Sequence, residues 1–352
     1  SALMSDRGVE DYVAKVRDEY AGIAARHAGK GRDQKRLGLA EARNNKYPIQ
    51  WTGYAPPKPK TLGVRSIDDV TVADLIPFID WTPFFQAWEL AGKFPAILDD
   101  AVVGEAARPL YDDAQKMLER IVSEDWLTVR GVVGLWPART VGDDDIAVFA
   151  DEDRTERLAT LHTLRQQMQK GSGRANFALA DFVAPEETDI ADYVGAFAVT
   201  AGHGEDEAAE RFKTSHDDYA AIMVKALADR LAEAFAEWLH RKVRMELWGY
   251  APDEALSNDE LIAEKYQGIR PAPGYPACPD HTEKQILWQL MDVEAKTGMK
   301  LTESCAMWPG ASVSGIYFSH PDSQYFGVGK IDRDQVEDYA KRKGMEVRDV
   351  ER

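Results

Sequence analysis

The amino-acid sequence predicts an α+β fold in which helices surround an antiparallel β-sheet. Helix-like and strand-like segments follow one another without the regular βαβ cadence of a parallel sheet, and no internal repeat is present. The dinucleotide fingerprint GxGxxG and the phosphate loop GxxxxGK[ST] are absent as well. Two strand-like segments near the C-terminus flank residues 320–323, His-Pro-Asp-Ser, a sequence typical of hairpin turns. These observations disfavour a doubly wound, Rossmann-type sheet.

The N-terminal part differs in character from the rest of the chain. Residues 7–28 carry apolar side chains at spacings of three and four, which predicts an amphipathic helix. A basic, glycine-bearing connector follows, and the prolines of 54–59 favour an extended segment over a helix. We therefore expect residues 1–32 to be a linker helix and connector from an upstream domain, and residues 33–352 to form the main domain.

The remaining elements follow from periodicity and composition. Helices are expected at 101–123, 152–170, 206–247 (as one or two helices), a short segment capped by Asn258, 282–297 and 332–343. Strands are expected at 131–136, 146–150, 177–182, 196–199, 313–319 and 325–329.

Composition and charge exclude several functional classes. The formal net charge of −17 disfavours nucleic-acid binding, which needs a cationic face. No apolar run approaches the roughly 18 residues that cross a bilayer, so no membrane association is expected. The two cysteines form no CxxC and the seven histidines form no HExxH, so neither zinc nor another protein-bound metal is expected. With so few cysteines, a disulfide framework is disfavoured and a cytoplasmic location is favoured.

The segment from Arg270 to Pro279 holds four prolines and a glycine in ten residues. Proline lacks a backbone donor, so this segment cannot be a helix or a central strand and must be a stiff, irregular loop. Such a loop loses little entropy when a ligand docks, and its carbonyls beside an arginine suit a zwitterionic ligand. From the residues alone, a simple connector between two helices is an equally good interpretation.

Longer blocks of the sequence resemble one protein family. They run in order from about residue 33 to 352 and are FIDWTPFFQAW (78–88), GVVGLWPAR (131–139), LADFVAP (179–185), IMVKALADRLAEAFAEWLH (222–240), YQGIRPAPGYPACPDHTEK (266–284) and LTESCAMWPGASVSGIYFSHPDSQYF (301–326). In these blocks the chain resembles the C-terminal activation (reactivation) domain of cobalamin-dependent methionine synthase, and residues 7–20 resemble the linker helix that precedes it. The cobalt-ligating DxHxxG motif and the folate and homocysteine modules of the family are missing.

The resemblance implies a methyltransferase module in methionine biosynthesis that is not competent for homocysteine methylation alone. In the family, this domain binds S-adenosylmethionine and presents its methyl for reductive methylation of cob(II)alamin to methylcobalamin. Cobalamin is carried by a neighbouring domain or chain, and flavodoxin or a flavoprotein reductase donates the electron. A free-standing S-adenosylmethionine-dependent methyltransferase and a non-catalytic docking module for a flavoprotein are the alternatives. Whether the chain is a fragment or a natural separate chain stays open.

The resemblance also implies the ligand-binding residues. Asp80 matches the family position for the ligand ammonium, and Arg270 matches the position for its carboxylate, a role that suits the planar guanidinium fork. Ala272 is expected to contribute backbone contacts, and Tyr325 and Phe326 match a further ligand-contacting pair. Second-tier candidates lie beside the loop: Glu264, Tyr275 and His281.

Several of these side chains also have structural interpretations. Asp80 suits the start of a helix near Trp81. We interpret Glu233, inside the long helical segment, as a solvated or structural carboxylate, and Cys278 as structural because no basic neighbour would activate it. Since typical flavodoxins are acidic like this chain, docking would need a local basic patch. Two candidates for that patch are Arg165 with Lys170 and Arg174, and Lys341 with Arg342 and Lys343.

Overall fold

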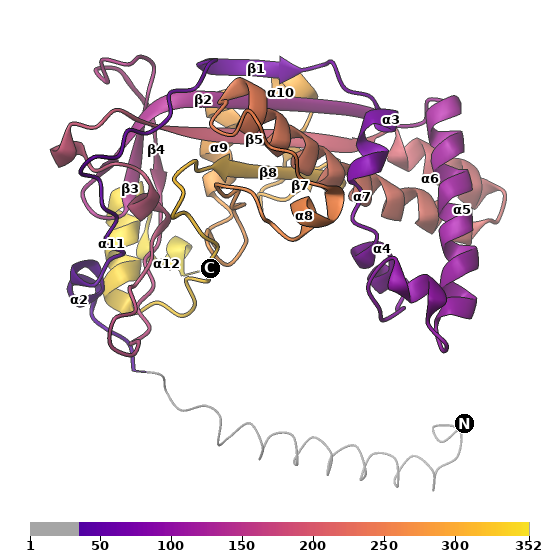
Figure 1. Cartoon of the computed structure of the whole chain (residues 1–352), viewed down its shortest axis with the longest axis horizontal. Helices are drawn as coiled ribbons and strands as arrows, with labels where there is room; N and C mark the ends of the chain where they lie inside the picture. The colour runs from indigo at the N-terminus through magenta and orange to yellow at the C-terminus, as the bar shows by residue number, and fades with distance from the viewer. Residues whose placement is uncertain (1–34, 352) are drawn as a thin grey trace, which may run out of the picture.

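The central strand of the fold is β2 (Thr128–Val141), in a computed structural model that describes residues 35–351. β2 pairs along one edge with β5 (Asp192–His203), and along the other edge first with β1 (Gly63–Ile67) and then with β3 (Asp145–Phe149). β4 (Arg157–His162) and β8 (Ser312–Tyr317) complete the order β4-β3-β2-β5-β8. Every pairing is antiparallel, which confirms the predicted fold class (Figure 1).

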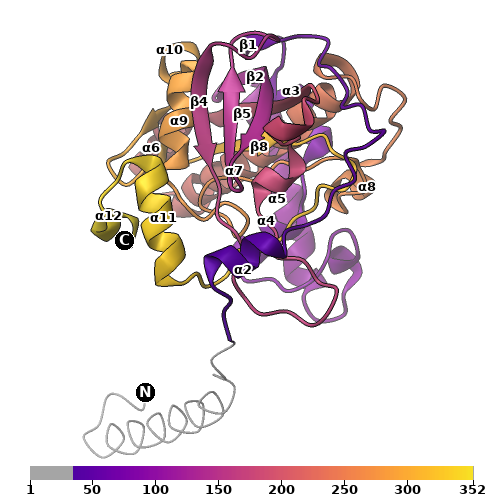
Figure 2. The same cartoon turned by 90° about the vertical axis from the view of Figure 1, so that its left-hand side faces the viewer.

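Helices cover both faces of this sheet (Figure 2). On one face the core contains α3 (Val72–Leu75), α4 (Thr82–Ala87), α5 (Gly104–Ser123), α6 (Glu205–Thr214) and α7 (Asp218–Lys242), which continues as the π turn η6 (Val243–Leu247). On the other face lie α9 (Glu283–Met291), α10 (Val293–Thr297) and the 3-10 turn η4 (Leu179–Phe182). The smaller elements are α2 (Leu39–Asn44), η2 (Ile76–Phe78), η3 (Ala96–Asp99), η5 (Glu186–Thr188), α8 (Asn258–Ile262), β6 (Lys300–Leu301), β7 (Met307–Trp308), α11 (Arg333–Lys343) and α12 (Val347–Val350).

Two glycines allow the close packing that positions the candidate site. A Cβ at Gly131 in β2 would lie 2.7 Å from the ring of Phe235, so this glycine lets α7 approach the sheet. A Cβ at Gly315 in β8 would lie 3.0 Å from the carbonyl oxygen of Pro271. The second glycine therefore lets the proline-rich loop lie directly against the edge of β8.

Most of the expected helices are present. The segment 206–247 forms α6 and α7, and α7 is capped by the side chain of Asp217, which accepts a hydrogen bond from the amide of Ala220. The short helix α8 is capped by Ser257 and not by Asn258, because the Ser257 hydroxyl accepts from the amide of Glu260. The helix expected at 7–28 lies outside the described residues.

Three expected elements are wrong. The segment 152–170 is not a helix: it contains β4, which pairs with β3, and its helix-forming composition is overridden by that pairing and by the burial of Arg165. The segment 177–182 ends in the 3-10 turn η4, because Asp181 accepts from the amide of Ala178. The segment 325–329 forms no strand, although the turn at 320–323 is present. The amide of Val328 instead donates to the carbonyl of Pro276 over 2.8 Å.

Candidate ligand-binding site

The proline-rich loop begins as an extension of the sheet edge. Ile269 and Phe318 exchange two backbone hydrogen bonds of 3.0 Å, and the amide of Ile316 donates to the carbonyl of Pro271 over 2.9 Å. After this point the loop closes on itself through turns and makes no regular element, as its prolines predict. The main chain on either side of Arg270 is thus fixed to β8.

The guanidinium of Arg270 is held by residues from two elements. Nη2 forms an ion pair of 2.8 Å with Oε2 of Glu237 in α7. Nη1 donates to the Tyr266 hydroxyl over 2.7 Å and to Nδ1 of His240 over 3.2 Å. The Arg270 amide donates to the Tyr325 hydroxyl over 3.0 Å. Side chain and backbone of Arg270 are therefore both fixed by the protein.

The charges around Arg270 are strongly coupled. Burial alone would lower the pKa of Arg270, but attraction to Glu237 and to the neighbouring tyrosines together outweighs burial, and the pKa is raised. Burial, with Arg244 and Arg270 nearby, lowers the pKa of His240 well below its usual value. His240 is therefore neutral, and because its Nδ1 accepts from Arg270, its proton is on Nε2. Arg270 remains a full positive charge beside a neutral imidazole.

Two adjoining cavities open beside this arginine. The first, here called the arginine cavity, has a volume of about 290 Å³, and its wall includes Asp80, Arg230, Glu233, Glu264 and Arg270. The second, here called the loop cavity, has a volume of about 230 Å³, and its wall includes Glu233, Ala272, Tyr275, His281, Lys284 and Ser314. Because Glu233 lines both, the two cavities adjoin at this residue, and they are together called the groove.

Asp80 has both of the properties that the sequence suggested for it. Its Oδ1 accepts a hydrogen bond of 3.0 Å from the amide of Thr82, which helps to begin α4. The same residue lines the arginine cavity and a neighbouring cavity of about 500 Å³ on its other side. Helix initiation and a place in the site are therefore compatible.

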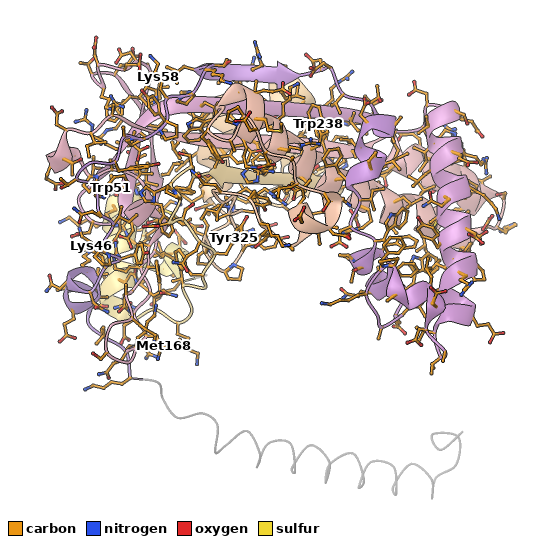
Figure 3. All side chains as sticks on the ribbon, viewed as in Figure 1. Lys46, Trp51, Lys58, Met168, Trp238 and Tyr325 are labelled. Atoms are coloured by element: carbon orange, nitrogen blue, oxygen red, sulfur yellow. The ribbon has the colours of Figure 1, made fainter. Side chains whose placement is uncertain are left out.

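The structure brings Tyr325 into this constellation and places Phe326 elsewhere. Tyr325 lies below β8 in the view of Figure 3 and accepts from the Arg270 amide. The ring of Phe326 stacks on Phe177, with centroids 5.5 Å apart, and lines neither the arginine cavity nor the loop cavity. The two adjacent side chains thus point into different environments.

The second-tier candidates all lie on the groove. Glu264 has a left-handed backbone with φ of 53°, which is uncommon for a non-glycine residue, and burial raises the pKa of its carboxyl. His281 accepts a hydrogen bond of 2.7 Å from Nζ of Lys284, and burial lowers the pKa of that lysine. Tyr275 is largely exposed at the outer wall of the loop cavity.

Sequence reasoning gave no site role to Glu233 or Glu237. Both are on α7, one helical turn apart, so they face the same side. Glu233 lines both cavities, and Glu237 holds Arg270. The available signal was the i, i+4 spacing of two glutamates in a long helix rich in alanine and leucine. It could not be interpreted without knowing that α7 lies beside the loop.

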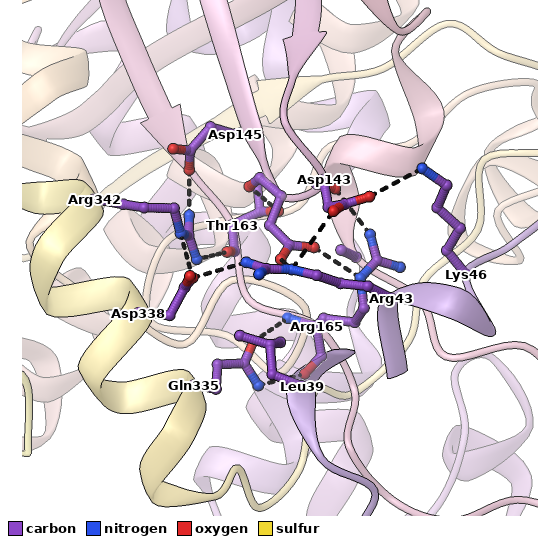
Figure 4. Close-up of polar contacts among 12 residues, drawn as sticks. Leu39, Arg43, Lys46, Asp143, Asp145, Thr163, Arg165, Gln335, Asp338 and Arg342 are labelled. Carbon is purple, nitrogen blue, oxygen red and sulfur yellow. Dashed lines mark hydrogen bonds and ion pairs between the residues drawn. The ribbon is translucent and has the colours of Figure 1, made fainter. Parts of the chain in front are cut away.

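Three of the six residues in the two expected basic patches form internal ion pairs. Arg165 is fully buried between Asp144 and Asp181. Figure 4 shows it beside Gln335, whose side chain hydrogen-bonds to the Arg165 backbone. Lys343 is 7% exposed and pairs with acidic side chains, and Arg342 is similarly engaged. The charges of Arg165, Arg342 and Lys343 are therefore neutralised within the domain, and Arg174 and Lys341 are the exposed members of the two groups.

A larger cavity of about 1010 Å³ lies between the loop and the C-terminal helices α11 and α12. It shares His281 with the loop cavity, but no arginine or lysine is in its wall. Within residues 35–351, no three side chains of the His, Cys, Asp and Glu types are placed to hold a metal ion. Over the same residues, no helix has the length and apolar character needed to traverse a bilayer.

Comparison with known proteins identifies the family. Residues 71–344 match the model for the activation domain of vitamin B12-dependent methionine synthase. A crystal structure of the MetH reactivation domain bound to AdoHcy is 59% identical in sequence and superimposes with a TM-score of 0.87. That match covers 90% of this chain and 96% of the other. The chain therefore belongs to the activation-domain family of vitamin B12-dependent methionine synthases.

Proposed function

We propose that this chain binds S-adenosylmethionine along the groove formed by the arginine cavity and the loop cavity. The observation that carries the proposal is the fixed guanidinium of Arg270 at a cavity whose wall also contains the carboxylate of Asp80. A ligand with an α-carboxylate and an α-ammonium matches such a pair of opposite charges. The 59% identical relative is bound to AdoHcy, which has the same two groups.

The assignment of each part of the ligand follows from the walls of the groove. The ligand carboxylate would pair with Arg270 and its ammonium with Asp80, in the arginine cavity. The adenosine part would extend past Glu233 into the loop cavity, where Ala272 and Tyr275 lie. Tyr325 supports the loop through the Arg270 amide. Phe326 keeps its place in the proposal only as part of the supporting core, beside Phe177.

The reaction we propose is reductive methylation of a cobalamin carried by a neighbouring domain or chain. One electron from a reduced flavodoxin or flavoprotein converts cob(II)alamin to cob(I)alamin. The cobalt electron pair then attacks the methyl carbon, the carbon–sulfur bond breaks, and S-adenosylhomocysteine leaves with the bonding electrons. Residues of this chain hold and orient the methyl donor, so that the attack is intramolecular within the complex. We place this reaction in the cytoplasm, where free cysteines stay reduced.

Calorimetric titration with S-adenosylmethionine tests the binding proposal. We expect Arg270→Ala and Asp80→Ala each to lower the affinity by at least about tenfold, the effect of losing one charge-assisted hydrogen bond. Exposed controls of the same residue types, Arg65→Ala and Asp68→Ala, should leave the affinity unchanged. Folded wild-type protein that binds no S-adenosylmethionine would refute the proposal.

A second experiment addresses the methyl acceptor. The chain is mixed with a cobalamin-loaded domain, a flavodoxin reducing system and S-adenosylmethionine, and methylcobalamin is followed by its absorbance. Formation that depends on all components supports the proposed reaction. Methyl transfer to an acceptor without cobalamin would favour a free-standing methyltransferase. Unchanged reactivation by Arg270→Ala would favour a docking module.

A further inference from the structure

Two residues that hold Arg270, Glu237 and Tyr266, are assigned no contact with the ligand in the function proposed above. Glu237 is 6% exposed at its side chain, and its Oε2 pairs with Arg270 over 2.8 Å. Its other oxygen, Oε1, is inaccessible to solvent, has no hydrogen-bond partner among the described residues and lies 3.9 Å from Nη1 of Arg244. Glu237 also lines the arginine cavity, but its carboxylate faces the guanidinium groups of Arg270 and Arg244.

Stability alone does not account for this buried carboxylate. Removing a carboxylate from water is costly unless both oxygens receive donors, and an apolar side chain of similar size often serves the fold as well or better. Glu237 has one oxygen without a donor, and the facing Nη1 of Arg244 lacks an acceptor as well. Residues that lower stability in this way are typical of functional sites.

Glu237 reduces the electrostatic repulsion between two neighbouring arginines of the site. Arg270, which is partly buried, and Arg244, which is fully buried, both lie against the ring of Tyr266, at 5.8 Å and 4.1 Å from its centroid. Arg244 is satisfied on its other edge by a bidentate pair with Glu254. The carboxylate of Glu237 stands between the two guanidinium groups and offsets their repulsion.

The residues that hold Arg270 (Glu237, His240 and Tyr266) leave some N–H donors of its guanidinium available to a ligand. Both Nη1 donors of Arg270 are used, by Tyr266 and by His240. Among the described residues Nε has no hydrogen-bond partner, and the Nη2 amino group has a second N–H besides the one beside Glu237. A carboxylate in the arginine cavity can therefore be held by Arg270 without displacing either Nη1 anchor.

We propose that Glu237 and Tyr266 are positioning residues that fix the guanidinium of Arg270 and thereby select ligands with an α-carboxylate. The inference rests on the proposed function, since it specifies how that site recognises S-adenosylmethionine. An arginine side chain has several rotatable bonds, and fixing them before binding removes that entropy cost from association. Because both side chains hold Arg270, we expect them to act on affinity through the carboxylate of the ligand.

Decarboxylated S-adenosylmethionine, which lacks the α-carboxylate, separates this role from a general structural one. In Glu237→Gln we expect the affinity for S-adenosylmethionine to fall by about tenfold and that for the decarboxylated ligand to stay within about twofold of wild type. In Tyr266→Phe, which loses one neutral acceptor, the corresponding loss should be about threefold. Calorimetry on the full chain gives all four values, and Glu246→Gln, an exposed glutamate in η6, is the matched control.

The outcomes are distinct. An equal loss for both ligands in the two variants means that the pair shapes the cavity and overturns the inference. Unchanged affinity for S-adenosylmethionine in both variants also overturns it, while the proposed function stands. If wild-type protein binds no S-adenosylmethionine, the proposed function fails and the inference fails with it. Circular dichroism of each variant establishes folding, and Tyr266→Phe decides the question if Glu237→Gln does not fold.

Discussion

Two arginines in this domain, one fully buried and one partly buried, have opposite environments. Arg165 is fully buried, and every donor of its guanidinium has an acceptor: carboxylates of Asp144 and Asp181, and the carbonyls of Asp143 and Asn176. Arg270 is 19% exposed, has anchors on Nη1 and Nη2, and lines a cavity with the rest of its edge. All hydrogen-bond donors of the Arg165 guanidinium are used within the protein, whereas the Arg270 guanidinium keeps donors for a ligand in the cavity.

The difference shows how to distinguish a structural charge from a ligand-binding charge. Arg165 belongs to an ion network in which Arg43 of α2 pairs with Asp144 over 2.7 Å and with Asp338 of α11 over 2.8 Å (Figure 4). That network connects segments from both ends of the described chain to the turn between β2 and β3, where Asp144 lies. A complete set of internal partners thus indicates an architectural role, whereas remaining donors at a cavity wall indicate recognition.

The largest effect on stability is expected from removing Arg165 from its ion pairs with Asp144 and Asp181. Arg165→Met leaves two buried carboxylates, Asp144 and Asp181, without their main partner, and we expect it to lower the free energy of unfolding by about 3–5 kcal/mol. Denaturant unfolding measures this, with Arg65→Met as the exposed control. The affinity of the folded fraction for S-adenosylmethionine should not change. A loss below about 1 kcal/mol would contradict an architectural role.

A smaller effect is expected at Asp192, a buried carboxylate that receives backbone donors from Ala184 and Tyr193 but forms no ion pair with another residue of 35–351. Burial raises its pKa to about 7. Since this folded-state pKa lies above the unfolded value of 3.8, its carboxyl favours the folded state at low pH, and this contribution is lost as the pH rises from about 4 to about 7.

We therefore expect the unfolding free energy of wild type to lose about 2 kcal/mol between about pH 5 and pH 7 through Asp192. Asp192→Asn should remove this part of the pH dependence, although it weakens one of the two backbone hydrogen bonds. The difference between the two unfolding profiles isolates Asp192 from other groups that titrate in the same range. Parallel profiles would show that Asp192 is ionised throughout, as a fully partnered carboxylate would be.

At Arg270 we expect a substitution to lower ligand affinity with little change in the free energy of unfolding. Arg270→Lys keeps the positive charge beside Glu237 but loses the planar fork, so the affinity for S-adenosylmethionine should fall by about tenfold. Unfolding stability should change by about 1 kcal/mol or less, because the ion pair is retained. Calorimetry and denaturant unfolding on the same preparation measure both quantities. A large stability loss with unchanged affinity would place Arg270 with Arg165 as an architectural residue.

The sequence predicted these two regions unequally. The prolines around Arg270 predicted an irregular loop, and the family resemblance pointed to its arginine. The anchors of Arg270 could not be predicted, because Glu237 and His240 reach it only through the packing of α7 on β2 at Gly131. At 152–170 the composition predicted a helix, whereas the burial of Arg165 and the pairing of β4 with β3 are tertiary effects that no local pattern encodes.

The smallest effect is expected at Tyr325, whose hydroxyl accepts from the Arg270 amide over 3.0 Å. Tyr325→Phe keeps the ring and removes one neutral acceptor, so we expect about 1 kcal/mol less stability and at most a threefold loss of affinity. The loop edge is still fixed by the backbone bonds between Ile269 and Phe318, which limits any movement of Arg270. An affinity loss as large as that of Arg270→Lys would instead mean that Tyr325 contacts the ligand itself. The Tyr325 hydroxyl would then recognise S-adenosylmethionine directly, together with the guanidinium of Arg270.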